Sequence, residues 1–83
     1  MRRVFKWPLD LRASGQQIGG GPVVLVGEQD GELTVWTEEG LEPPYDRVVA
    51  VFGTGHTIPE DAKHLGSALM PPFVWHVYET LRF

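Results

Sequence analysis

The stretch that decides the fold is VVLVGEQDGELTVWT, residues 23–37. Two runs rich in β-branched and apolar residues, 23–26 and 33–37, flank the pair Asp30-Gly31. An Asp-Gly pair between two such runs strongly favours a β-hairpin, because a type I′ turn needs a positive φ at both central residues. This segment therefore predicts two antiparallel strands, and the apolar run 23–26 predicts that the first of them is buried.

Three further segments carry strand patterns on either side of this hairpin. Residues 4–11 place Phe5, Trp7 and Leu9 on one face, and Pro8 marks the segment as an edge strand or a strand with a break. Residues 47–52 are apolar on both faces, which predicts a central strand covered above and below. Residues 73–78 alternate between two faces and predict a last strand.

The segments between these strands carry turn and loop chemistry. Residues 14–22 hold four glycines and a proline, and residues 38–46 are acidic and contain Pro43-Pro44, so both are predicted loops. Residues 59–64 favour a single helical turn, and residues 65–70 fit either a strand or a helix. We therefore predict one mainly β domain over residues 1–83, an antiparallel meander, barrel or sandwich of five to six short strands with at most one short helical turn.

Composition restricts the class of protein. With 83 residues, 42% of them apolar and 22% charged, the chain fits one small ordered domain, for which oligomerisation is an open possibility. The absence of cysteine excludes disulfides, thiolate zinc sites and cysteine nucleophiles, and favours the cytoplasm. The apolar run at 22–26 is far shorter than the ~20 residues that span a bilayer, and no leader pattern is present, so we expect no membrane association.

The charge is unevenly distributed along the chain. Residues 1–12 carry four basic side chains against one acid (+3), and the rest carries three against ten (−7), which gives the net charge of −4. The basic arm, with Arg2, Arg3 and Lys6, could contact phosphate, but the acidic body would repel a nucleic acid beyond it. We expect the arm to pair with the domain's own acidic loops, and we expect no nucleic-acid partner.

The turn Gly53-Thr54-Gly55-His56 is the candidate ligand loop. Glycines after a strand let the backbone come close to a bound group, but this turn has no Walker pattern, no lysine and no long following helix. We therefore predict a tight exit from a central strand, with His56 held by local hydrogen bonds, and keep ligand binding as the alternative.

The remaining reactive side chains predict no catalytic or metal site. His56, His64 and His76 match no short zinc motif, and His76 is expected to pack among aromatic rings with a backbone hydrogen bond. Neither Ser14 nor Ser67 lies in a nucleophile elbow, so we expect no enzyme, no metal and no cofactor.

Trp36 is the main interface candidate. If Leu33, Val35 and Thr37 face inward, Trp36 faces outward beside Glu32 and Thr34, where an exposed tryptophan commonly anchors an interface. Arg2 and Arg3 of the basic arm are further interface candidates. The alternative is that Trp36 packs under a loop or against the arm.

Three phrases carry a resemblance to a known family: RVFKWPL at 3–9, FGTGHTIP at 52–59 and PFVWHVYE at 72–79. They resemble a family of small uncharacterised proteins of bacteriophages and actinobacteria, a domain of unknown function. The resemblance implies a stand-alone cytoplasmic protein with no assigned activity. Two hypotheses follow. The first is a non-enzymatic protein-binding module, with a protein partner or self-association and a possible role as a phage-encoded modulator of a host protein. The second is a small-ligand, nucleotide or nucleic-acid site that combines the Gly53–His56 turn with the basic arm.

Overall fold

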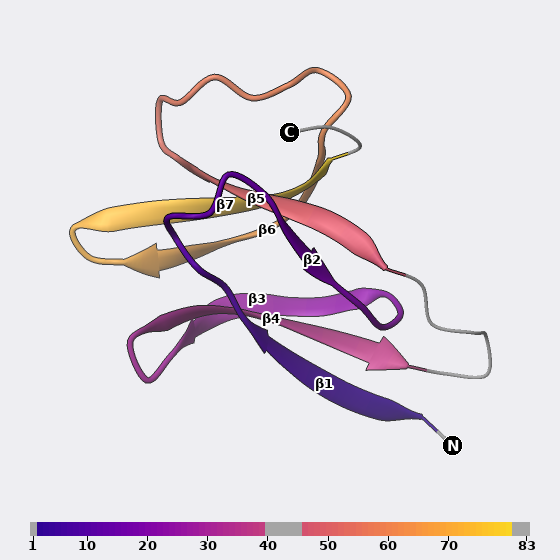
Figure 1. Cartoon of the computed structure of the whole chain (residues 1–83). Coiled ribbons are helices and arrows are strands. Elements are labelled where there is room, and N and C mark those ends of the chain that lie inside the picture. The colour runs from indigo at the N-terminus through magenta and orange to yellow at the C-terminus, as the bar shows by residue number, and fades with distance from the viewer. Residues whose placement is uncertain (1, 40–45, 81–83) are drawn as a thin grey trace.

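Seven β-strands form two antiparallel sheets in the computed structural model, which describes residues 2–39 and 46–80 (Figure 1). The three-stranded sheet has the order β1-β4-β3, and the four-stranded sheet has the order β2-β5-β7-β6. The strands are β1 Arg3–Pro8, β2 Gln16–Ile18, β3 Val23–Gln29, β4 Glu32–Glu39, β5 Arg47–Gly53, β6 Lys63–Met70 and β7 Phe73–Thr80. The mainly β, antiparallel fold class is confirmed, and the expected five to six strands are one or two too few.

The predicted hairpin is confirmed. β3 and β4 pair in register from Gln29 opposite Glu32, and Asp30 and Gly31 between them have φ values of 53° and 83°. The expected burial of β3 is wrong, since Leu25 is 56% exposed. Leu25 lies opposite Trp36 on the outer face of the three-stranded sheet, and a bulge at Val24 turns that residue into solvent as well.

β1 is an edge strand, as predicted, and it ends at Pro8 rather than at residue 11. It pairs with β4, and the Trp7 Nε1–H donates to the Thr37 hydroxyl at 2.9 Å. Beyond the strand, the Leu9 N–H donates to the Leu33 carbonyl at 2.8 Å and carries Leu9 into the core. The inward face predicted for this segment is confirmed, because Phe5 and Trp7 are half-buried and Leu9 is buried. Val4 and Lys6, on the other face, are exposed.

The predicted loop at 14–22 is wrong in its middle, because β2 pairs there with β5. Ile18 is buried in the core, and Gln16 exchanges two side-chain hydrogen bonds with the Asp10 backbone at 2.8 and 2.9 Å. A three-residue strand is too short to show a periodic pattern, and the glycines on both sides of β2 predict a loop instead.

β5 lies in the interior of the four-stranded sheet between β2 and β7, as predicted. Its first residue, Arg47, is buried, donates from Nη2 to the Gly21 carbonyl at 2.7 Å and lies 3.5 Å from the Glu79 carboxylate. The segment 59–64 is not helical. A turn closed by the Ala62 N–H and the Pro59 carbonyl (3.1 Å) leads directly into β6, which includes the segment 65–70.

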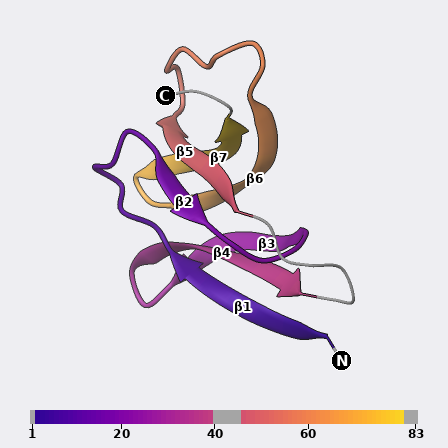
Figure 2. The same ribbon diagram turned by 45° about the vertical axis from the view of Figure 1, so that its right-hand side comes forward.

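The two sheets pack face to face over one core, and the edges of β3 and β6 lie side by side (Figures 1 and 2). The core side chains are Leu9, Ile18, Leu33, Val35, Val49, Ala68 and Val77. At the β3–β6 contact, a Cβ atom built on Gly66 would lie 2.6 Å from Val26 Cγ2, so only glycine lets the strands approach this closely.

One end of the molecule collects four connections. They are the β3–β4 turn, the β6–β7 hairpin, residues 9–12 after β1 and the turn 53–56 after β5, and we call this part the hairpin end (left in Figure 1). The start of β1, the end of β4 and the start of β5 lie at the opposite end. Among the described residues, the structure contains no helix that is long and apolar enough to cross a membrane.

Candidate functional site

Three cavities lined by described residues open at the hairpin end. The loop cavity, of about 600 Å³, lies between residues 8–12 and residues 31–33. The central groove, of about 470 Å³, is lined by Leu11, Glu28, Gly31, Leu69, Met70, Pro71, Pro72, Phe73 and Trp75. The turn cavity, of about 320 Å³, is lined by Gly53, Thr54, His56, Pro72, Phe73, Val74 and Trp75.

These cavities are neighbours, because they share walls. The loop cavity and the central groove share Leu11 and Gly31, and the central groove and the turn cavity share Pro72, Phe73 and Trp75. The result is one concave surface around the hairpin end, which we call the hairpin-end groove.

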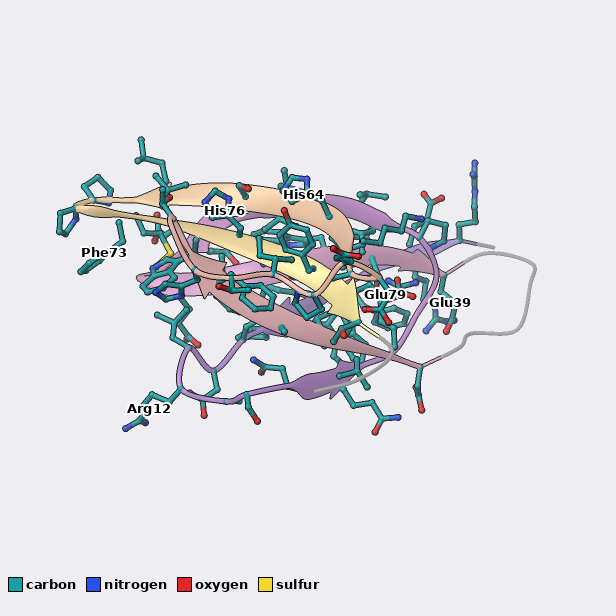
Figure 3. All side chains as sticks on the ribbon, turned by 90° about the horizontal axis from the view of Figure 1, so that it is seen from above. Arg12, Glu39, His64, Phe73, His76 and Glu79 are labelled. Carbon is teal, nitrogen blue, oxygen red and sulfur yellow. The ribbon has the colours of Figure 1, made fainter. Side chains whose placement is uncertain are left out.

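The middle of the hairpin-end groove is apolar and exposed. Leu69 is 71% exposed and Phe73 57% exposed, and Leu11 on the facing loop is also exposed. The ring of Phe73 lies against that of Trp75, with centroids 5.4 Å apart, and Figure 3 shows Phe73 near the tip of its hairpin. Bulky apolar side chains gathered in solvent around a concavity are typical of an interaction site.

The loop side of the groove is acidic. Glu28, Asp30 and Glu32 are exposed around the β3–β4 turn, and Asp10 pairs with Arg12 at 3.8 Å across residues 10–12. Four carboxylates against one guanidinium leave a charge of −3 on these five side chains. The Glu28 carboxylate is held in place, because it accepts the Gly31 N–H at 2.6 Å.

The Gly53–His56 turn has the predicted form. The His56 N–H donates to the Gly53 carbonyl at 3.1 Å, and the Gly53 N–H donates to His56 Nδ1 at 3.1 Å. Gly55 has a φ of 92°, which favours glycine. The turn also forms one wall of the turn cavity, which presents the Thr54 hydroxyl and the His56 imidazole beside two aromatic rings.

A chain of polar side chains runs from the turn after β5 across β7 to β6, on the face away from the core. Thr54 Oγ1 lies 3.0 Å from His76 Nε2, His76 Nδ1 lies 2.7 Å from Ser67 Oγ, and Ser67 Oγ lies 2.9 Å from His64 Nε2. Figure 3 shows His64 and His76 on the same side of the ribbon. The expectation of a backbone hydrogen bond for the His76 ring is wrong, since the partners of both ring nitrogens are side-chain hydroxyls.

The Ser67–His76 pair has the spacing of a nucleophile and its base. Neither residue lines any of the three cavities, so a substrate bound in one of these cavities would not contact the pair. The chain of hydrogen bonds instead ties the turn 53–56 to β7 and β6. Within residues 2–39 and 46–80, no group of three or more His, Cys, Asp or Glu side chains is arranged to hold a metal ion.

The interface residues predicted around Trp36 are only partly accessible. Trp36 is half-buried on the outer face of the three-stranded sheet, opposite Lys6 on one side and Leu25 on the other. Thr34 is 1% exposed, so its place among the interface candidates is wrong. It belongs to the middle strand, and a hydrogen bond of 2.9 Å from Lys6 Nζ to Gln29 Oε1 spans that strand.

The remaining interface candidates lie at opposite ends of the molecule. Glu32 lines the loop cavity at the hairpin end. Arg3 lies opposite Glu39 in the β1–β4 pair, and Arg2 Nη1 lies 3.5 Å from a carboxylate oxygen of Glu38. The basic arm thus pairs with the domain's own acids, as expected. The structure does not bring it together with the Gly53–His56 turn.

The sequence could not reveal the hairpin-end groove. Its residues come from four separate stretches between Pro8 and Trp75, and only pairing of the strands brings them together. The one usable signal was the Leu69–Phe73 segment, LMPPF, where apolar residues surround a turn-forming proline pair.

Comparison with known families gives one match. The model of the family described as "Domain of unknown function (DUF7352)" matches residues 1–82, so the chain belongs to this family. No curated protein and no solved structure matches the chain.

Proposed function

We propose that this chain is a non-enzymatic protein-binding module that docks a partner in the hairpin-end groove. The observation that carries the proposal is the exposure of Leu69, Phe73 and Leu11 around one concave surface. Full burial of a leucine or phenylalanine side chain is worth roughly 1.5–3 kcal/mol, which this fold leaves unused at these positions. A partner that covers them gains that free energy on binding.

The sequence supports a biological setting for this module. The resemblance to proteins of bacteriophages supports a phage-encoded protein that binds and redirects a host protein, and the lack of cysteine supports action in the cytoplasm. The position of Ser67 and His76 outside the three cavities supports a role without catalysis.

The second candidate is a small-ligand site in the turn cavity. Its volume of about 320 Å³ lies at the lower end of the range for ligand sites, and Phe73 and Trp75 offer aromatic walls beside the His56 imidazole. None of the residues that line this cavity is a lysine or an arginine, so a phosphate group would find no cation there. Nucleotides and nucleic acids are therefore disfavoured as ligands.

Affinity capture with matched variants tests the proposal. The bait is the wild-type chain, Leu69→Ser or Leu25→Ser, each exposed to an actinobacterial lysate, and the affinity of the purified partner is then measured by calorimetry. Both leucines are exposed strand residues, but only Leu69 lines the groove. Loss of about 2 kcal/mol at a central anchor corresponds to roughly 30-fold weaker binding for Leu69→Ser. Leu25→Ser should bind like the wild type.

Two results would overturn the proposal. One is a partner that Leu69→Ser binds as tightly as the wild type. The other is the absence of any specific partner together with a monomeric wild type in sedimentation. Thermal-shift screening against nucleotides, oligonucleotides and divalent metals decides on the second candidate, since a stabilisation that His56→Ala removes would place the ligand in the turn cavity.

A further inference from the structure

We infer that the segment bound in the hairpin-end groove is an extended peptide that carries a bulky apolar side chain next to a lysine or an arginine. This inference rests on the proposed function and specifies the chemistry of the partner. It follows from two neighbouring features of one surface, an apolar floor and an acidic flank.

The apolar part is the central groove between the β3–β4 turn and the β6–β7 hairpin. Leu11 lines it on the loop side, and Leu69, Phe73 and Trp75 line it on the side of the β6–β7 hairpin. Its volume of about 470 Å³ lies within the range of sites that bury a drug-sized ligand, so one bulky side chain fits with room for its backbone. The groove therefore selects a partner with an exposed apolar anchor.

The acidic part adjoins this groove directly. Glu28 belongs to the lining of the central groove, Glu32 to the lining of the loop cavity, and exposed Asp30 lies in the turn between them. The one cationic side chain in these two linings is Arg12, which already pairs with Asp10. A basic side chain on the partner would meet a net negative charge, which raises the association rate and favours basic partners over acidic ones.

The two parts lie close enough for one short segment to reach both. The loop cavity and the central groove share Leu11 and Gly31, so an apolar side chain in the groove places its neighbours beside Glu28 and Glu32. A linear segment with both side chain types therefore suits this surface better than two separate contacts from a folded partner.

A competing occupant is a second copy of this chain. Its basic arm presents exposed Val4 beside Arg2 and Arg3, which is similar chemistry. That arm is already part of β1 and lies beside Glu38 and Glu39 of its own β4, and leaving these contacts would cost free energy. We therefore assign the groove to a segment of another protein.

Selection from a random library of displayed peptides, about 12 residues long, tests the inference. Peptides are selected on the wild-type chain and counter-selected on Leu69→Ser. A synthetic copy of the most enriched peptide is then titrated by fluorescence anisotropy against Leu69→Ser, Leu25→Ser, Glu32→Lys and Glu60→Lys. Glu60 is the charge control, because it is exposed on the β5–β6 connection and lines none of the three cavities.

The enriched peptides should share a bulky apolar residue within a few positions of lysine or arginine. We expect Leu69→Ser to weaken binding at least about tenfold, and Glu32→Lys to weaken it several-fold at about 0.05 M salt and less at about 0.5 M, where screening shortens the range of the charges. Leu25→Ser and Glu60→Lys should leave the affinity within about twofold of the wild type. Thermal melts of all variants show whether each one is folded.

The results separate a failure of this inference from a failure of the proposed function. If no enriched peptide depends on Leu69, the groove is not a docking site, and the inference and the proposed function fail together. Peptides that depend on Leu69 but carry no excess of basic residues, or that bind Glu32→Lys normally, overturn the charge assignment and leave the proposed function standing. Concentration-dependent self-association of the wild type that Leu69→Ser abolishes assigns the groove to a second copy and overturns the inference.

Discussion

The replacement Gly66→Ala should destabilise the fold strongly, because β6 touches β3 at this residue. An added Cβ atom would lie 2.6 Å from Val26 Cγ2 and 2.7 Å from Val26 Cβ. Contacts this short require the two strands to move apart, since Val26 Cβ is attached rigidly to its backbone. Overpacking of a well-packed site costs about 1–3 kcal/mol, and we expect about 2–3 kcal/mol here.

The assay is thermal and urea denaturation followed by circular dichroism. For a domain of this size, 1 kcal/mol corresponds to about 4–8 °C in melting temperature, so Gly66→Ala should melt about 8–24 °C below the wild type. Gly27→Ala is the matched control, because Gly27 lies on the neighbouring strand β3 and its nearest contact for an added Cβ is Trp36 Cζ3 at 3.7 Å. That variant should be more stable than the wild type by about 0.4–1 kcal/mol through the lost freedom of the unfolded chain.

A double mutant identifies the contact. In a Val26→Ala background the Cγ2 atom is gone and the Cβ atom remains, so the cost of Gly66→Ala should fall without vanishing. If Gly66→Ala melts at or above the temperature of the wild type, the close approach of β3 and β6 is refuted. If Gly66→Ala lowers the free energy of unfolding equally in both backgrounds, Val26 is not the residue that the added Cβ atom contacts.

Four further predictions concern stability and are measured by urea denaturation. Gly31→Ala should cost about 1–2 kcal/mol, since Gly31 has a left-handed φ of 83° in the β3–β4 turn. Ser67→Ala should cost about 0.5–1.5 kcal/mol because His76 loses a hydrogen-bond partner, and a chelator should leave the stability of the wild type and of His76→Ala unchanged. Trp7→Phe should cost about 1–3 kcal/mol, because it removes the donor to the buried Thr37 hydroxyl.

Each of these predictions has a contradicting result. A stable Gly31→Ala would mean that the turn does not need a left-handed residue. A Ser67→Ala variant as stable as the wild type would mean that the hydrogen bond to His76 contributes nothing to stability. A chelator that destabilises the wild type but not His76→Ala would assign a metal ion to His76. A Trp7→Phe variant as stable as the wild type would mean that the Thr37 hydroxyl has another donor or contributes little.

The features predicted correctly from the sequence are those with local causes. The Asp30-Gly31 turn needs only two residues with a positive φ, and the turn at Gly53 is closed by hydrogen bonds to His56, three residues away. The interior position of β5 follows from apolar residues on both faces. Each of these patterns is contained within a few consecutive residues, so one sequence suffices to find it.

The features that were missed depend on which strands become neighbours. The run 23–26 is apolar and predicts burial, but Leu25 lies beside Trp36 on the outer face of its sheet and remains in solvent. Ser67 lies directly opposite His76 in the β6–β7 pair, and a bulge between His64 and Gly66 turns His64 onto the same face. No pattern along the chain encodes such a register shift, and the hairpin-end groove escaped prediction for the same reason.

The strand edges of this fold are covered, short or protected, which favours docking in the groove over the addition of a partner strand to a sheet. β3 and β6 cover each other's edges at Val26 and Gly66, and β2 has only three residues. The remaining edge, β1, ends in Pro8, which has no N–H to donate, and it carries exposed Lys6 and the basic residues before it. Proline and lysine on an outer strand are typical protections against edge pairing. A partner that binds through its own backbone would find β1 poorly suited, whereas the hairpin-end groove offers side chains that the fold leaves uncovered.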